Sequence, residues 1–377
     1  MNLNPLRRCW VEIDLSAFRR NAAELRRLSG PDKGLMAVVK ADAYGHGLEA
    51  VVSTLNGLVD WFCVANVREA LRIRDCLPGN CPPILLLSPI TPDECETALT
   101  HGFSLSVSSV GEVETYGNAA KHFKTKLKLH AVADTGMGRI GASPADWHPL
   151  LEAIRNHPAC ELEGVSTHFP NADENAEFTD NQIRMFRDLT TNFEGQVHLS
   201  NSAGIIDFSA QMPFATLTRP GLALYGTTPQ CQTQANLTPA LSMKTRITLI
   251  RDIAAGTTIS YGSTFTADRA MTTASLAVGY GDGFPRHLSG QGAEVLIAGT
   301  RCPLLGRVTM DQIVVDVSHL DGLKPGDEVV LIGEQGGEAI TASELAEKSG
   351  TIPWEIYTGI SSRVERVYFD SENPELD

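Results

Sequence analysis

The stretch LMAVVKADAYGHG, residues 35–47, begins with an apolar run, reaches a single lysine at Lys40 and continues into a turn with two glycines. An apolar, β-branched run of this kind is typical of a strand that is buried on both faces, as in a parallel sheet. In parallel α/β folds the functional residues stand where the strands end. The stretch therefore predicts both a fold class and a place for chemistry.

Similar short runs recur along the first part of the chain. The seven that follow are 61–66, 83–88, 103–108, 126–134, 162–168, 196–201 and 216–226. The segments between them have the apolar period of helices, as in DWHPLLEAIRNH (146–157) and NQIRMFRDLTTNF (181–193). Eight alternations of strand and helix predict a (β/α)8 barrel. An open doubly wound sheet is the alternative, although no GxGxxG motif follows the first run.

The character of the chain changes near residue 240. Strand-like runs such as ASLAVGYG (274–281) and DEVVLIG (327–333) are now separated by Gly, Asp and Pro turns. We predict a barrel over 12–238 that binds the cofactor and a mostly-β domain over 239–377. The sequence leaves open whether residues 1–11 pair with this second domain.

Composition limits the possible partners. With 31 basic and 45 acidic residues the net charge is −14, which argues against nucleic acid and anionic membranes and favours a small-molecule substrate. We find neither a membrane-spanning run nor a signal peptide, so we expect a cytoplasmic protein. The eight cysteines are scattered, without CxxC pairs or zinc spacing, so we expect reduced thiols and no metal site.

Polar residues follow several of the predicted strands. An amine such as Lys40, partly desolvated beside other cations, loses affinity for its proton and can form a Schiff base with an aldehyde; the alternative is a lysine that only extends into solvent. Ser202 and the amide of Gly221 could bind a phosphate. Together these groups fit a phosphorylated aldehyde, pyridoxal 5′-phosphate. From these residues we predict Lys40, Tyr44, Ser202 and Gly221 as cofactor contacts.

Eight motifs form a set along the chain. They are AVVKADAYGHG (37–47), DTGMGRIG (134–141), THFPNADE (167–174), SNSAG (200–204), RPGLALYG (219–226), ISYGSTF (259–265), VGYGDGFPR (278–286) and GRVTMDQ (306–312). In order and approximate spacing this set resembles the bacterial alanine racemases. The resemblance implies a pyridoxal-phosphate racemase that interconverts L- and D-alanine and supplies D-alanine for peptidoglycan. It also implies a head-to-tail homodimer with active sites shared between subunits.

The resemblance also implies roles for catalytic residues. Lys40 would hold the cofactor and act as acid and base on the D face, and Tyr261 of the partner subunit would act on the opposite face. Inversion at Cα needs a proton donor and an acceptor on opposite sides. Because a phenol normally keeps its proton at neutral pH, Tyr261 would need help from His168 and Arg139. Arg139 would also meet the substrate carboxylate.

The resemblance adds Asn201, Arg219 and Tyr225 to the cofactor contacts, and it gives further roles to Arg219 and to three other residues. Arg219 would face the pyridine nitrogen of the cofactor and, since arginine cannot accept a proton, would leave that nitrogen unprotonated. We expect this choice to limit side reactions such as transamination. By resemblance, Met310 and Asp311 contact the substrate carboxylate from the partner subunit, and Tyr280 lines the entrance to the site.

The sequence departs from the family pattern at two positions. Val132 stands where many members carry a lysine whose carbamate positions the motif arginine, and Ser362 stands where many carry a tyrosine that narrows the entrance. A racemase that also accepts serine is therefore one alternative. A non-catalytic pyridoxal-phosphate-binding barrel is another, although it would have no need of Tyr261, Arg139 and Met310.

Overall fold

The computed structural model describes residues 7–229, 231 and 233–373. The chain forms two compact units. The barrel unit contains Ala17–Ala43 and Leu48–Thr238, and the β unit contains the chain up to Ser16, the segment Tyr44–Gly47 and the chain from Pro239 onward. We describe each unit by itself.

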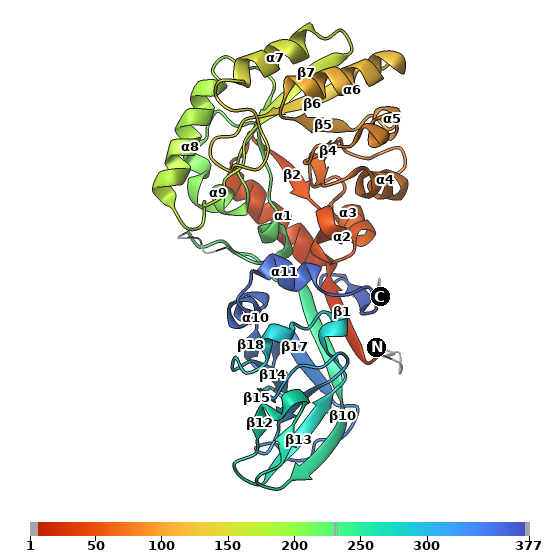
Figure 1. Ribbon diagram of the computed structural model, residues 1–377, viewed down its shortest axis with the longest axis vertical. Coiled ribbons are helices and arrows are strands. Elements are labelled where there is room, and N and C mark those ends of the chain that lie inside the picture. Colours follow the sequence, from red (N-terminus) through yellow and green to blue (C-terminus); the bar gives the residue numbers. More distant parts are fainter. Residues whose placement is uncertain (1–6, 230, 232, 374–377) are drawn as a thin grey trace. The chain divides into compact units, whose positions relative to one another are not determined.

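Eight parallel strands close into a barrel in chain order (Figure 1). They are β2 (Gly34–Val38), β3 (Trp61–Val64), β4 (Ile84–Leu86), β5 (Ser104–Val107), β6 (Leu127–Val132), β7 (Cys160–Ser166), β8 (Gln196–His198) and β9 (Leu217–Thr218). Pairing of Gly34 with Leu217 closes the ring. The predicted (β/α)8 barrel is confirmed, and the open sheet is excluded.

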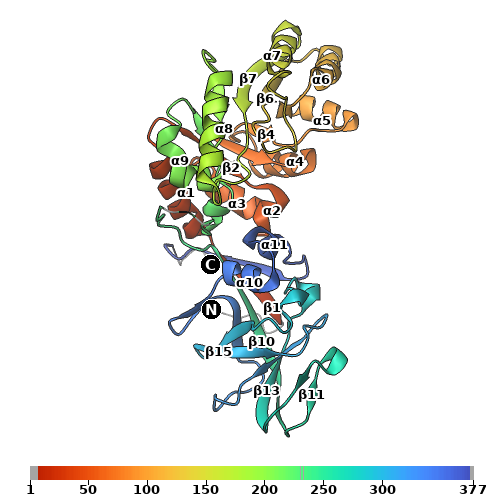
Figure 2. The same cartoon turned by 60° about the vertical axis from the view of Figure 1, so that its left-hand side comes forward.

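Helices cover the outside of this barrel (Figure 1, Figure 2). They are α1 (Leu15–Ser29), α3 (Leu48–Leu55), α4 (Val67–Cys76), α5 (Cys95–Thr100), α6 (Val110–His122), α7 (Trp147–Asn156), α8 (Ala176–Leu189) and α9 (Ser202–Phe208). Four of them begin at side-chain caps, in which a side-chain oxygen accepts a backbone N–H of the first turn: Asn66 before α4, Ser109 before α6, Asn175 before α8 and Asn201 before α9. The caps of α4, α6 and α9 place these helix starts within a few residues of the preceding strand ends, whereas a longer loop separates α8 from β7.

The last apolar run, 216–226, differs from the prediction. Its strand covers only Leu217–Thr218, and Leu222–Tyr225 forms the short 3-10 helix η3. Pro220 has no N–H for a strand ladder, and Gly221 turns the backbone away from extended geometry with φ −112° and ψ −99°. The chain therefore leaves the strand ladder after Thr218.

The β unit is a nine-stranded sheet in the order β18-β17-β14-β15-β16-β13-β10-β1-β19. Its strands are β1 (Cys9–Asp14), β10 (Leu241–Ile253), β13 (Met271–Leu276), β14 (Glu294–Ile297), β15 (Thr300–Leu305), β16 (Ile313–Asp316), β17 (Glu328–Gln335), β18 (Glu338–Ile340) and β19 (Glu365–Phe369). A small hairpin, β11 (Thr258–Ile259) and β12 (Phe265–Thr266), stands beside it, with helices α10 (Ala342–Ser349) and α11 (Pro353–Thr358).

The amino-terminal strand belongs to this sheet. β1 runs antiparallel to β10 and parallel to β19. Of residues 1–11, whose pairing the sequence left open, 1–6 lie outside the described residues. In the described part of the chain no helix has both the length and the apolar character needed to cross a bilayer.

Candidate active site

Six predicted residues lie at the carboxyl ends of the barrel strands. Arg139 lies in the loop after β6, and the others follow their strands closely: Lys40 after β2, His168 after β7, Asn201 and Ser202 after β8, and Arg219 after β9. Strands of a parallel barrel end at one rim, so the fold brings these side chains to the same side. Gly221 and Tyr225 belong to the same unit.

The chain turns left-handed directly after Lys40. Ala41, Asp42, Ala43 and Tyr44 have φ of +53°, +55°, +51° and +53°, within the segment α2 (Lys40–Tyr44). For residues with a side chain this conformation costs about 1 kcal/mol or more each, so the surroundings must hold it.

Two carboxylates hold the turn. Glu69 of α4 accepts the N–H of Ala41 at 2.6 Å and the N–H of Ala65 at 3.0 Å, which ties the end of β2 to the end of β3. Asp42 accepts from Arg72 at 2.7 Å. The position of Lys40 is thereby set by the barrel backbone.

The surroundings of Lys40 weaken its hold on its proton. Burial is the largest cause that lowers the pKa of this ammonium group, and the charge of Arg139 lowers it further, whereas Glu69 opposes the shift. More of the amine is therefore neutral at a given pH, which is the form that attacks an aldehyde.

Replacing Glu69 by glutamine tests this arrangement. The amide keeps the shape but loses the charge, so we expect the free energy of unfolding to fall by about 1–3 kcal/mol. Because the carboxylate raises the pKa of Lys40, its loss should move the pH midpoint of Lys40 modification by a small aldehyde to lower pH. Urea unfolding and borohydride trapping across pH measure the two effects.

Glu112 provides a matched control. It accepts the N–H groups of Ser108 and Ser109 at 2.6 and 3.0 Å after β5, in the same half-buried setting but with no lysine in the turn. Glu112→Gln should reduce stability similarly and leave the Lys40 midpoint in place. Equal midpoint shifts in both variants would contradict the proposed influence of Glu69.

Arg219 is buried, and hydrogen bonds fix the position of its side chain. Its guanidinium donates to the carbonyl oxygens of Thr167 and His198 at 2.6 and 2.8 Å, and to Nδ1 of His198 and of His168. Burial lowers its pKa to about 10, so it remains a cation at neutral pH. No carboxylate of a described residue forms an ion pair with it.

A chain of buried hydrogen bonds leads away from Arg219. His198 Nε2 lies 2.7 Å from His130 Nδ1, and His130 Nε2 lies 3.3 Å from Glu163. Burial lowers the pKa of both histidines, so both are neutral. Because Arg219 can only donate, each Nδ1 accepts and each Nε2 carries the hydrogen, which fixes both tautomers.

Glu163 ends this chain as a carboxylate. Burial alone would raise its pKa, but hydrogen bonds from His130, Lys128 and Ser104 outweigh that effect and lower the pKa to about 2. A negative charge at one end of the chain thus balances the buried positive charge at the other.

His168 is a neutral donor. Burial, followed by the charges of Arg219 and Arg139, lowers its pKa to about 3. Nδ1 accepts from Arg219 at 3.3 Å, which leaves the hydrogen on Nε2. The free N–H suits a hydrogen bond to a phenolate or another anion.

The predicted phosphate contacts form one compact turn. Ser202 Oγ accepts the N–H groups of Gly221 and Ala223, both at 3.1 Å, and keeps its own hydrogen to donate. Asn201 caps α9 by accepting from Gly204 at 3.0 Å. The Tyr225 hydroxyl, expected as a cofactor contact, donates to the carbonyl oxygen of Val38 at 2.9 Å, which ties η3 to β2.

The loop that carries Arg139 is held through its backbone. Asp134 accepts the N–H groups of Gly136 and Gly138 at 2.9 and 3.1 Å. Val132, which precedes the loop, is buried and apolar. Arg139 itself is exposed, and no described residue forms an ion pair or hydrogen bond with its guanidinium.

The other predicted residues lie in the β unit: Tyr44, Tyr261, Tyr280, Met310 and Asp311. Tyr261 is 72% exposed and stands at the tip of the β11–β12 hairpin, in the 3-10 turn η4 (Tyr261–Ser263). Beneath it an apolar cluster of Ile253, Ile259, Ala267, Met271 and Leu305 fixes the hairpin. The phenol is thus presented outward on a supported turn.

Arg363, which sequence reasoning missed, contacts two of these residues, Met310 and Asp311. It donates to Asp311 and Asp282 at 2.8 Å each and to the carbonyl oxygen of Met310 at 3.4 Å. The backbone N–H of Tyr280 donates to the carbonyl oxygen of Thr309, the residue before Met310. The position of Arg363 directly after Ser362 could have drawn attention to it, but only the absence of a tyrosine at residue 362 was considered in this stretch.

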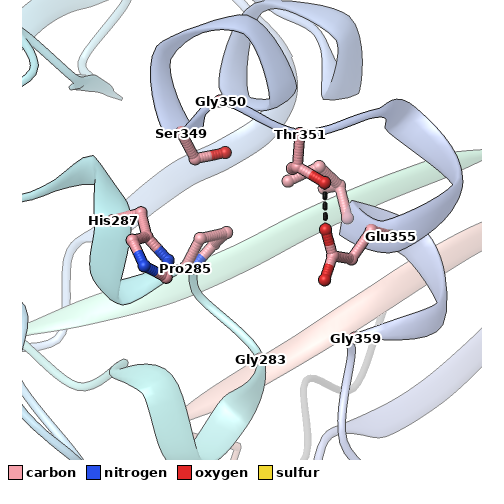
Figure 3. A pocket seen from close by; sticks show the side chains of 9 residues that line it. Gly283, Pro285, His287, Ser349, Gly350, Thr351, Glu355 and Gly359 are labelled. Atoms are coloured by element: carbon pink, nitrogen blue, oxygen red, sulfur yellow. Dashed lines mark hydrogen bonds between the residues drawn. The ribbon is translucent and has the colours of Figure 1, made fainter.

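A pocket of about 380 Å³ in the β unit is separate from these residues (Figure 3). The segments 283–287 and 349–359 line it, and Thr351 bonds Glu355 across its wall. None of the predicted site residues is among its lining residues.

Comparison with known proteins covers both parts of the chain. Residues 13–229 match the family described as alanine racemase, N-terminal domain, and residues 240–368 match alanine racemase, C-terminal domain. The alanine racemase of Halothermothrix orenii is 39% identical over 382 residues, covering 98% of each chain.

Solved structures agree with these matches. Alanine racemase from Bacillus anthracis with bound L-Ala-P is 36% identical, with a TM-score of 0.87 over 97% of this chain and 96% of that one. Alanine racemase from D-cycloserine producing Streptomyces lavendulae is 33% identical, with a TM-score of 0.89 over 97% of this chain and 98% of that one.

Proposed function

The chain belongs to the alanine racemase family of isomerases, and from that premise we propose that it interconverts L- and D-alanine by two-base proton transfer with pyridoxal 5′-phosphate. The observation that carries the proposal is the buried Arg219 guanidinium. It lies at the strand ends with a lysine of lowered pKa and has no acidic partner among the described residues.

The residues present fit this cofactor. Lys40 would hold it through its amine, Ser202 and Gly221 would face its phosphate, and Arg219 would face its ring nitrogen. Tyr44, Asn201 and Tyr225 complete the proposed contacts. When bound, the cofactor withdraws electrons from Cα of the amino acid and so makes the Cα proton acidic.

The side chains then divide the proton transfer between two faces. Lys40, with its lowered pKa, takes or returns the proton on the D face, and Tyr261 of the partner subunit does so on the other. The Nε2–H of His168 supports the ionised phenol. Arg139 binds the substrate carboxylate, with Met310 and Asp311 of the partner subunit as further contacts and Tyr280 at the entrance.

These roles require a homodimer, which we include in the proposal. The exposure of Tyr261 and Met310, at 72% and 53%, supports a surface that another subunit covers. We keep 12–238 and 239–377 as the proposed domains. A cytoplasmic location and a role in peptidoglycan supply remain proposals from the resemblance.

Racemisation of a panel of amino acids tests the proposed function. Ser362 is exposed and small, and a pocket can reject an added hydroxyl only weakly, so we expect kcat/KM for alanine to exceed that for serine by about 10- to 100-fold. Polarimetry with each L-amino acid measures it. Equal turnover of serine would favour the broader racemase, and cofactor binding without any turnover would favour the non-catalytic alternative.

A further inference from the structure

Gln182, on the buried side of α8, has no role in the proposed chemistry. Its side chain is 1% exposed, and its Nε2 donates to Oγ1 of Thr135 at 3.1 Å and to the carbonyl oxygen of His168 at 3.3 Å. The two acceptors lie after different strands, since Thr135 follows β6 in the loop that carries Arg139 and His168 follows β7. One amide therefore joins the two loops.

Hydrogen bonds continue from Thr135 to the neighbouring strand end. Oγ1 of Thr135 accepts from Gln182 and also lies 2.7 Å from Oγ1 of Thr167, where either hydroxyl can be the donor. Thr167 precedes His168, and its carbonyl oxygen accepts from Arg219 at 2.6 Å. Gln182 is thus linked to the strand end on which the site is built.

The helix also packs tightly against the loop at Gly136. A Cβ at this position would lie 2.8 Å from Cζ of Phe178 and 3.6 Å from Nε2 of Gln182, and φ is +136°. A side chain at this position would have to displace the Phe178 ring and adopt a left-handed φ, so glycine allows the loop to lie in contact with α8.

Packing alone does not account for glutamine at this position. Its Oε1 is buried without a hydrogen-bond partner among the described residues, which destabilises the fold relative to an apolar side chain. Arg139 has no side-chain partner in the described structure, and Val132 supplies no polar group. The position of the loop therefore depends on contacts such as those of Gln182.

We propose that Gln182 is a positioning residue for substrate binding: by holding residues 134–141 against the His168 strand end, it fixes where Arg139 meets the substrate carboxylate. This inference rests on the role proposed above for Arg139. It predicts that loss of the amide weakens recognition of a carboxylate more than it slows proton transfer.

Gln182→Met in the cofactor-loaded enzyme tests it, because methionine has similar length and no hydrogen-bonding amide. We expect KM for alanine and the inhibition constant of propionate to rise about tenfold, with a smaller fall in kcat. Amide hydrogen exchange over 136–141 should become faster. Thr135→Val should act likewise, and Thr135→Ser should restore normal values.

Thr179→Val is the matched control on the same buried side of α8. Thr179 is 0% exposed, and its hydroxyl donates to the carbonyl oxygens of Asn175 and Asn171 at 2.9 and 3.4 Å. It should change KM and the propionate constant by less than about twofold. A change as large as that of Gln182→Met would overturn the proposal.

A double-mutant cycle with Arg139→Gln shows whether Gln182 acts through Arg139. In the Arg139→Gln background, Gln182→Met should add less than about twofold to KM. A full tenfold effect in that background, or unchanged exchange of the loop, rejects the positioning role alone. If Arg139→Gln itself leaves KM and propionate binding unchanged, the proposed role of Arg139 fails, and the inference fails with it.

Discussion

Lys40→Ala should reduce racemisation by at least about 10⁴-fold, because the residue is both the proposed cofactor anchor and one of the two acid/bases. The barrel should stay folded, since the left-handed turn after residue 40 is held by Glu69 and Asp42 rather than by the amine. Steady-state polarimetry with saturating cofactor measures the loss. Borohydride reduction and peptide mapping of the unaltered protein should place the cofactor on Lys40.

Lys33 is a control from the same unit. Burial lowers the pKa of this lysine too, but its ammonium donates to the carbonyl oxygen of Ser209 at 3.0 Å, away from the strand-end residues. Lys33→Ala should keep racemisation within about threefold of normal. Reduced cofactor found on Lys33 or on any other lysine would refute the central assignment.

Tyr261→Phe should lower racemisation by about 10²- to 10⁴-fold while cofactor binding persists. The variant lacks only the phenolic oxygen, and the ring keeps its support on the β11–β12 hairpin. Because Lys40 is proposed to act on the D face, exchange of the Cα proton of D-alanine with deuterated solvent should continue. Exchange from L-alanine should be lost, and mass spectrometry of both enantiomers measures the difference.

Tyr116→Phe provides the matching loss of a hydroxyl elsewhere. The Tyr116 hydroxyl donates to the carbonyl oxygen of Ile90 at 2.7 Å on the outer helices of the barrel. Its removal should lower the free energy of unfolding but leave exchange of the Cα proton of D-alanine and of L-alanine unchanged. Full racemisation by Tyr261→Phe would exclude the two-base scheme, whatever the control shows.

The sequence predicted the barrel because eight buried strands give eight apolar runs, each marked by its own composition. It failed at the eighth run because apolar residues around Pro220 and Gly221 have the same composition in a strand and in a 3-10 helix. The sequence predicted a turn after Lys40, but not the left-handed conformation of Ala41–Ala43, because alanine disfavours positive φ. Tertiary hydrogen bonds to Glu69 and from Arg72 help to hold it, together with the local bond from Ala43 N–H to the carbonyl oxygen of Val39.

Site residues differed in the same way. Lys40 and Arg219 could be found because strand ends are visible in a periodic pattern. The hydrogen-bonded chain of His130, His198 and Glu163 could not be predicted. These polar residues lie inside three different strands, and only the pairing of the strands brings them together. Gln182 and Arg363 act across more than 40 residues of sequence, so no local pattern contains both partners.

The buried histidine chain also sets an acid limit for the fold. An unfolded histidine titrates near pH 6.5, whereas burial lowers the pKa of His130 and His198 in the folded barrel. Below pH 6.5 these two histidines therefore bind protons in the unfolded chain but not in the folded chain. The free energy of unfolding falls with decreasing pH, by up to about 1.4 kcal/mol per pH unit for each histidine. Both imidazoles must stay neutral for His198 to accept from Arg219 and for His130 to accept from His198. The pair that orients this guanidinium therefore also lowers the stability of the fold in acid.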